Sequence, residues 1–214
     1  MTLEDILMGV QVNVDQSVDP IDWSDDDTKT RINLINRGIR TWANDNVTRW
    51  QELYQTEEIG NVGVGSAEFS LPDDFVLLEA VWIGGNRVEV REPQDAKDNG
   101  LYVFVTGNKV DGYNLNLGWT VEENDAHIGK TIKVLYYREP TELVKHKDIP
   151  EMSDPNYLIA YASAEAMVSD DLNMYSKFTG DAQVFLANMR ERNLQMAQGQ
   201  NDSVFDDLNG GLDE

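Results

Sequence analysis

The sequence predicts an α+β fold, in which a helical bundle built from both ends of the chain carries a central antiparallel β-sandwich or small barrel. Apolar residues recur at helical spacing in residues 1–46 and again in residues 150–200. Residues 47–149 contain short alternating runs separated by turn residues, a pattern typical of an antiparallel β module. Residues 201–214 lose the helical period and are rich in acid and glycine, so we expect an extended acidic C-terminal tail.

The β module is organised around one predicted strand, Phe75 to Ile83, which is apolar on both faces and has Glu79 as its only charge. Such a strand is expected to need cover on both faces. Leu71-Pro72-Asp73-Asp74 before it has turn chemistry, because proline fixes φ and aspartate bonds its own backbone. Gly84-Gly85-Asn86 after it permits a tight reversal, and a return strand is predicted from Arg87 to Val90.

The predicted helices have local start signals. A short helix is expected after an N-cap at Thr2 and through about Met8 or Val10. Ser24, followed by three aspartates, starts a second helix that ends near Asn44. Asp154-Pro155 starts a third helix, and Thr179-Gly180 is expected to separate it from a fourth. The predicted helix core consists of Ile32, Ile35, Ile39, Trp42, Leu158, Tyr161, Phe185 and Met189.

The charge balance is strongly acidic, with a formal net charge of −22 over 214 residues. Residues 1–28 hold eight acids and no base, and residues 201–214 hold five acids and no base. A negatively charged surface repels phosphate backbones, so we do not expect this protein to bind nucleic acid tightly.

The sequence lacks the features of several kinds of protein and site. It has no cysteine, so it has neither disulfides nor thiolate metal sites. Its first residues do not have the pattern of a secretory signal, and no apolar run approaches the roughly 20 residues that span a bilayer. We therefore expect synthesis in the host cytoplasm and no membrane partner.

Two glycine motifs resemble nucleotide-binding loops only superficially. Ile128-Gly129-Lys130-Thr131 ends like a P-loop, but Asn124 stands where the upstream glycine belongs and a strand pattern follows. Gly60, Gly63 and Gly65 have the dinucleotide-binding spacing reversed and open no helix. We interpret them as a flexible loop and predict no cofactor site.

No catalytic or metal constellation emerges from the polar residues. His127 and His146 are the only histidines, and each lies in a polar stretch without a second histidine nearby. Adjacent acids, such as Asp73/Asp74 and Asp170/Asp171, could serve glycoside hydrolysis, but in so acidic a chain such pairs are expected by chance, and we interpret most of them as solvated surface. We therefore predict no catalytic residue, no metal site and no enzyme.

The order of elements, together with several short motifs, resembles a known family. A helical N-terminus leads to the turn LPDDF at residues 71–75, the strand end KVLYYREP at residues 133–140 and the linker PEM at residues 150–152. YLIAYASAEA at residues 157–166 and a long amphipathic helix follow. Over about residues 1–200 the chain is similar to the head-to-tail adaptor proteins of short-tailed bacteriophages, the tail tubular protein A type.

The resemblance implies a structural virion protein of the phage neck. In that family usually twelve copies form a ring beneath the portal, which extends the DNA exit channel and provides a platform for the tail nozzle or tail fibres. Double-stranded DNA would pass through without specific binding. The loop of Gly60, Gly63 and Gly65 would face the tail. The portal anchors implied in the C-terminal tail are Val204, Phe205, Leu208 and Leu212.

Two alternatives remain open at the level of the sequence. One is a carbohydrate-binding β-sandwich in a tail protein, for which the aromatic side chains would form an exposed row. The other is an acidic DNA mimic, for which the acids would be spaced like phosphates on one face. Clustering of the acids at the two termini argues against the mimic.

Overall fold

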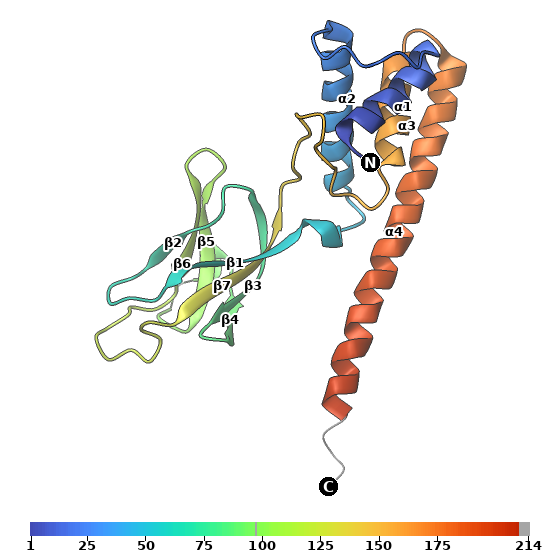
Figure 1. Ribbon diagram of the computed structural model, residues 1–214. Coiled ribbons are helices and arrows are strands. Elements are labelled where there is room, and N and C mark those ends of the chain that lie inside the picture. Colours follow the sequence, from blue (N-terminus) through green and yellow to red (C-terminus); the bar gives the residue numbers. More distant parts are fainter. Residues whose placement is uncertain (97, 210–214) are drawn as a thin grey trace. The chain divides into compact units, whose positions relative to one another are not determined.

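The structure is a computed structural model that describes residues 1–96 and 98–209, with side chains described as far as residue 197 (Figure 1). The chain divides into two compact units. Residues 1–52, together with the chain from residue 140 onward, form the helical unit, and residues 53–139 form the β unit.

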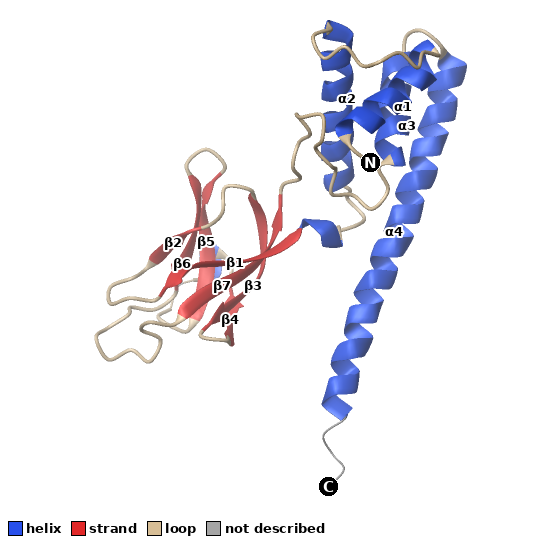
Figure 2. Cartoon of the chain, viewed as in Figure 1, coloured by secondary structure: helices blue, strands red, loops and turns tan. Residues whose placement is uncertain are grey.

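The helical unit contains four α-helices, coloured blue in Figure 2, within the part of the chain that the structure describes. They are α1 (Leu3–Asp15), α2 (Asp26–Ala43), α3 (Asn156–Met167) and α4 (Leu172–Asn209). The other three helices pack against α3. Small side chains of α3 are buried there, including Ala160, Ala162, Ser163 and Ala164.

Glycines allow α1 and α2 to approach α3 closely. A Cβ atom added to Gly9 of α1 would lie 2.7 Å from Cδ1 of Ile159, and one added to Gly38 of α2 would lie 2.9 Å from Cδ1 of Tyr161. Both distances are shorter than ordinary van der Waals contact, so even alanine would force a neighbour to move at either position.

The starts of the first two helices differ in part from expectation. A capping box between Thr2 and Asp5 begins α1, which continues to Asp15, five residues beyond the predicted end. Asp25 occupies the N-cap position of α2, and the predicted cap Ser24 instead donates its hydroxyl to Asp22. The aspartates near Ser24 offer several alternative hydrogen-bond partners to its hydroxyl and to the backbone. The prediction from sequence therefore placed the N-cap one residue too early.

The break between the last two helices was predicted in the wrong place. The α-helical chain stops after Met167 and resumes at Leu172, and α4 then runs without interruption through Thr179 and Gly180. Asp171 marks the true start, because its Oδ1 accepts hydrogen bonds from the backbone N–H groups of two following residues. One glycine costs a packed helix only about 1 kcal/mol, which does not end it.

The α4 backbone also remains helical over residues 201–209, where we expected an extended tail. Extending an existing helix requires no new nucleus, so a sequence of weak helix formers can continue it. Residues 210–214 lie outside the described residues.

The β unit is one sheet of seven strands in the order β1-β7-β3-β4-β5-β6-β2, which curls into a nearly closed barrel. All neighbouring pairs are antiparallel except β4 and β5, which pair in parallel. The predicted small barrel is therefore confirmed in outline, but it is not wholly antiparallel. The strands are β1 (Tyr54–Asn61), β2 (Glu68–Ser70), β3 (Phe75–Ile83), β4 (Asn86–Val90), β5 (Tyr102–Asn108), β6 (Gly112–Leu117) and β7 (Thr131–Arg138).

The barrel buries one face of its strands. Val81 and Ile83 of β3 pair with Val134 and Ile132 of β7, and all four side chains are fully buried in the core of the β unit. The other face of β3 is only partly covered, since Leu77 is exposed. The two-sided cover expected for this strand is therefore incomplete within the described residues.

Candidate assembly interface

The two histidines, the first candidates for chemistry, lie in different units. In the β unit, Asp125 accepts hydrogen bonds from the backbone N–H of His127 and from Nε1 of Trp119, and lies 2.7 Å from Nδ1 of His127. The backbone N–H of His127, followed by its ring, lowers the pKa of Asp125. Among the described residues, no group of three or more histidine, aspartate or glutamate side chains could hold a metal.

The tryptophans do not form the exposed row that a sugar-binding face would need. Trp42 and Trp50 are fully buried in the helical unit and stack on each other with ring centroids 5.3 Å apart. Trp82 lies in the β unit, beside a hollow of about 520 Å³ on the outer face of the sheet. Glu58 and Lys133 line the same hollow, which therefore carries one aromatic ring.

The three glycines of the predicted tail-facing loop have different surroundings. Gly60 belongs to β1 and follows a register shift in its pairing with β7. Gly65 has φ +73°, a conformation that favours glycine, and Gly63 donates its N–H to the hydroxyl of Ser66. The loop is consequently shorter than the sequence suggested.

The predicted helix core lies inside the helical unit. Ile35, Ile39, Trp42, Leu158 and Met189 are fully buried. Ile32, Tyr161 and Phe185 are half-buried. Three of the implied portal anchors, Val204, Phe205 and Leu208, belong to the helical backbone of α4, and Leu212 lies outside the described residues.

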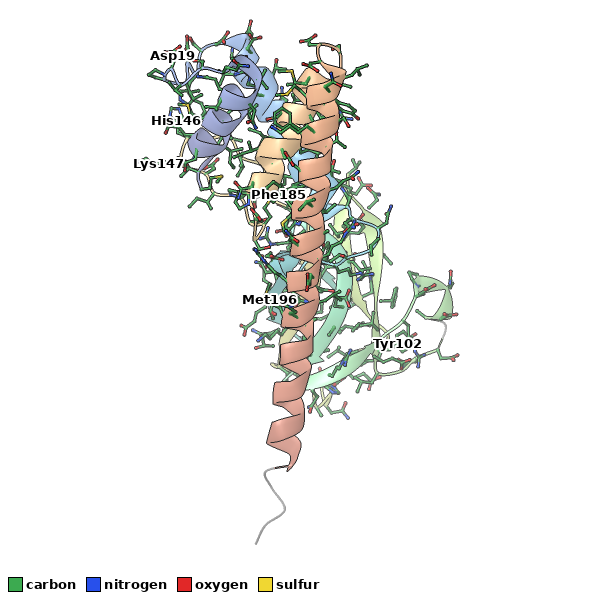
Figure 3. The ribbon with its side chains drawn as sticks, turned by 90° about the vertical axis from the view of Figure 1, so that its right-hand side faces the viewer. Asp19, Tyr102, His146, Lys147, Phe185 and Met196 are labelled. Carbon is green, nitrogen blue, oxygen red and sulfur yellow. The ribbon has the colours of Figure 1, made fainter. Side chains whose placement is uncertain are left out.

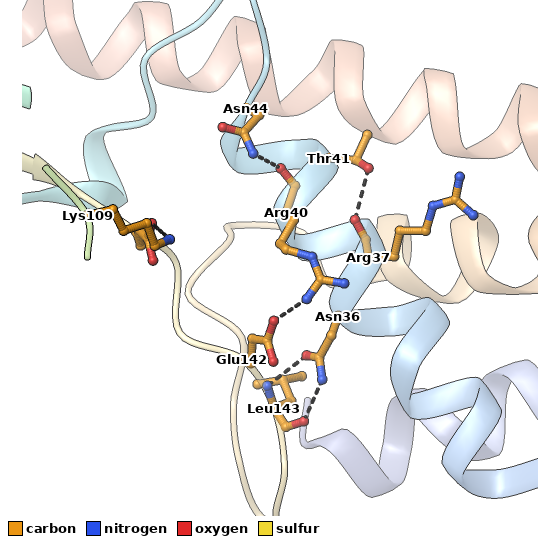
Figure 4. Close-up of polar contacts among 9 residues, drawn as sticks. Asn36, Arg37, Arg40, Thr41, Asn44, Lys109, Glu142 and Leu143 are labelled. Carbon is orange, nitrogen blue, oxygen red and sulfur yellow. Dashed lines mark hydrogen bonds and ion pairs between the residues drawn. The ribbon is translucent and has the colours of Figure 1, made fainter. Parts of the chain in front are cut away.

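A loop that sequence reasoning placed in the β module is clamped onto the helical unit. The side-chain amide of Asn36 in α2 donates to the carbonyl of Leu143, and its oxygen accepts from the N–H of the same residue, at 2.9 and 2.8 Å (Figure 4). Arg40 forms an ion pair with Glu142 beside this clamp. Leu143 is buried, which anchors the segment that follows it.

That segment, residues 144–149, forms what we call the basic loop. Its backbone is fixed to the start of α1, because the carbonyls of His146 and Asp148 accept hydrogen bonds from the N–H groups of Glu4 and Leu3. The Asp148 carboxylate accepts from the N–H groups of Lys145 and Val144, and these bonds lower its pKa. Hydrogen bonds therefore fix the loop both to the start of α1 and within itself.

The basic loop presents its side chains to solvent. The ring of His146 stacks on Trp23 with centroids 3.6 Å apart and an angle of 7° between the planes. Val144 and Ile149 expose 69% and 65% of their surface, and Lys145 and Lys147 are exposed between them. Figure 3 shows His146 and Lys147 at the edge of the helical unit.

The two lysines of this loop differ from most other cations of the helical unit, although Lys177 and Arg192 of α4 also lie outside its ion pairs. Lys145 and Lys147 take part in none of the ion pairs found among the described residues. Five other cations of the unit are paired within the chain, in Lys29–Asp26, Arg31–Asp15, Arg37–Glu165, Arg40–Glu142 and Arg190–Asp45. In a chain of net charge −22, the basic loop holds two lysines and one acid, Asp148.

A second exposed surface runs along α4, and we call it the outer stripe. It comprises Gly180, Val184, Ala187, Glu191 and Leu194, at spacings of four, three, four and three residues, with Asp181 beside it. Residues at these spacings share one face of a helix. Val184 and Leu194 expose 58% and 60% of their surface, so this face of α4 is open and partly apolar. Its charged side chains are Glu191, Asp181 at its edge and the exposed Lys177, three residues before Gly180.

The family comparison now assigns the chain. Residues 1–208 match the family described as SU10 adaptor protein. The chain belongs to this family of phage head-to-tail adaptors. A search of curated proteins found no match.

Membership confirms the resemblance inferred from the motifs and identifies the chain as a phage adaptor, a structural class of protein. The exposed surfaces of a structural adaptor, such as the basic loop and the outer stripe, are therefore more relevant to its function than its clefts. None of the adaptor's described helices is both long and apolar enough to cross a bilayer.

Sequence reasoning missed both surfaces of this adaptor. The three consecutive residues Lys145, His146 and Lys147 were a readable signal, since no other three consecutive positions all hold lysine, arginine or histidine. The stacking of His146 on Trp23, more than a hundred positions earlier, has no local signature. The outer stripe was hidden because Gly180 was interpreted as a helix break.

Proposed function

We propose that this adaptor assembles as a ring, of about twelve copies, beneath the portal of a tailed phage. The ring extends the DNA exit channel and provides the platform to which tail nozzle or tail fibre proteins attach. The observation that carries the proposal is the family match over residues 1–208, which spans both units and nearly the whole chain.

The acidity of the chain supports a passive role toward DNA. A formal net charge of −22 per copy becomes a strongly negative collar when many copies surround the channel. Such walls repel sliding phosphates instead of retaining them. Double-stranded DNA therefore passes without specific binding.

The two ends of the adaptor serve different neighbours in this proposal. The C-terminal segment binds the portal through the apolar side chains Val204, Phe205, Leu208 and Leu212, which stand out in an otherwise acidic sequence. The loop of Gly60, Gly63 and Gly65 in the β unit faces the tail.

The experiment is reconstitution with the portal protein of the same phage. Purified adaptor alone is expected to be a monomer or a weak oligomer in sedimentation velocity, because ring closure uses the portal as a template. After mixing, electron microscopy is expected to show portal rings with an added layer of adaptor density. An adaptor that stays monomeric and unbound with the portal present would contradict the proposal.

A matched pair of variants tests the role of the C-terminal segment. Replacing Val204, Phe205, Leu208 and Leu212 with alanine is expected to abolish portal binding, because it removes the buried apolar contacts. Replacing Asp202, Asp206 and Asp207 with asparagine leaves the four apolar side chains in place and serves as the control. If the two variants bound the portal equally well, the segment would not be the anchor.

A further inference from the structure

We propose that neighbouring copies of the adaptor contact each other through the basic loop of one copy and the outer stripe of α4 on the next. This inference rests on the proposed ring and names its lateral contact. The two surfaces are different patches of one chain, so the contact is heterologous, the type that closes into a ring.

The two surfaces lie on different sides of the helical unit. The basic loop is fixed to the start of α1 by backbone hydrogen bonds, and α1 and α4 both pack against α3. Figure 3 shows His146 and Lys147 at one edge of the unit, apart from α4. A copy can therefore offer its loop to one neighbour and its stripe to another.

Their charges are complementary. The loop presents Lys145 and Lys147 outside the ion pairs found among the described residues, and the stripe presents Glu191, with the exposed Asp181 beside it. Copies that each carry −22 repel one another on average, so association requires local contacts of opposite sign. The basic loop, with two lysines and one acid, offers such a positive contact.

Their apolar side chains match as well. Val144 and Ile149 flank the lysines, and Val184 and Leu194 flank the glutamate of the stripe. All four expose more than half of their surface in the single chain. Aliphatic groups beside charged groups on both partners give a contact with a dry centre and a charged rim.

Gly180 supplies an independent indication that another chain approaches the stripe. Gly9 and Gly38 are explained by close helix crossings within the chain, because an added Cβ would meet α3 side chains. An added Cβ on Gly180 would meet no atom within 4 Å, although glycine within a helix costs about 1 kcal/mol relative to alanine. A neighbouring copy packed against this point gives the glycine the same role that Gly9 and Gly38 have.

Charge reversal tests the pairing in the reconstitution with portal. Lys145→Glu with Lys147→Glu, and separately Asp181→Lys with Glu191→Lys, are each expected to raise the adaptor concentration needed for half-maximal ring formation about tenfold or more. The chain carrying all four substitutions restores opposite signs and is expected to recover to within about threefold of the original chain. Arg87→Glu with Lys133→Glu, in the β unit, changes net charge as much as the loop variant and is the control.

Cross-linking tests the contact directly, because the chain has no cysteine of its own. A chain with both Lys147→Cys and Glu191→Cys, treated with a bismaleimide, is expected to give a ladder of dimer, trimer and larger species. A mixture of the two single variants is expected to stop at the dimer, as a heterologous contact requires. Pairing Lys147→Cys with Arg87→Cys is the control and is expected to give no ladder.

The outcomes separate this inference from the function on which it rests. If the original chain forms no ring with portal, the proposed function fails and the inference falls with it. If rings form but the charge reversals leave them intact, or the double-cysteine chain gives no ladder within them, the inference alone is overturned. A dimer from the Lys147→Cys chain alone would also overturn it, because that product indicates a self-paired contact.

Discussion

The neighbouring helices α3 and α4 are consecutive in the chain but have opposite roles. Twelve-residue α3 packs against three helices and buries residues all around its circumference, including Leu158, Ala162 and Ser163. By contrast, α4 buries one face, represented by Phe178, Ala182 and Met189, and leaves the opposite face open. The difference indicates that α3 is packed within the fold, whereas α4 keeps one face exposed.

The comparison predicts opposite responses to truncation of a leucine. Leu158→Ala on α3 is expected to lower the free energy of unfolding by about 2–5 kcal/mol, because a fully buried side chain leaves a cavity. Leu194→Ala on α4 is expected to change it by no more than about 0.5 kcal/mol. Urea denaturation followed by the helical circular dichroism signal measures both, and equal losses would refute the distinction between the helices.

A second prediction concerns the ion pair that holds α4 to the chain after α2. Arg190 donates from Nε and from a terminal nitrogen to the two oxygens of Asp45, each at 2.8 Å, and the Asp45 side chain is only 6% exposed. Asp45→Asn is expected to cost about 1–3 kcal/mol at neutral pH, because it leaves the guanidinium without its charged partner.

The pH dependence of that loss has a definite sign. The hydrogen bond from Arg190 lowers the pKa of Asp45, so the stabilisation is fully present above the unfolded-state pKa of about 4 and disappears as the pH falls through the lowered value. The difference between the original chain and Asp45→Asn should therefore shrink in acid. Asp26→Asn is the control, since its exposed pair with Lys29 is worth at most about 0.5–1 kcal/mol. A difference that grew on acidification would contradict the assignment.

The sequence predicted those parts of the fold whose boundaries are written locally. Both ends of β3 were predicted correctly because Pro72 and the Gly84-Gly85 pair mark them with turn chemistry. The boundary between α3 and α4 was misplaced because Asp170-Asp171 was interpreted as a solvated acid pair, whereas Asp171 caps a helix. An aspartate has the same appearance in both roles, and only the hydrogen bonds of the folded backbone distinguish them.

The candidate interface was even less accessible to prediction. Lys145 and Lys147 are visible as charges in the sequence, but their exposure depends on Asn36, which anchors Leu143 from a position more than a hundred residues away. The parallel pairing of β4 with β5 is equally non-local, since it depends on the path of the connection between them. Contacts of this kind join residues that are far apart in the chain, so they cannot be predicted from any short stretch of the sequence.

Substitutions of two glycines are expected to change stability with opposite signs in α2 and α4. Gly38→Ala is expected to destabilise the chain by about 1–3 kcal/mol, because the new Cβ would overlap the side chains of Tyr161 and Leu158 on α3. Gly180→Ala on α4 is expected to stabilise the isolated chain by about 0.5–1 kcal/mol, because it improves helix propensity and meets nothing. Urea denaturation measures both, and a destabilising Gly180→Ala would mean that the glycine serves the fold of the single chain. If the stabilised variant then assembled more weakly with portal, the glycine would be retained for the neighbouring copy, at the expense of the stability of each subunit.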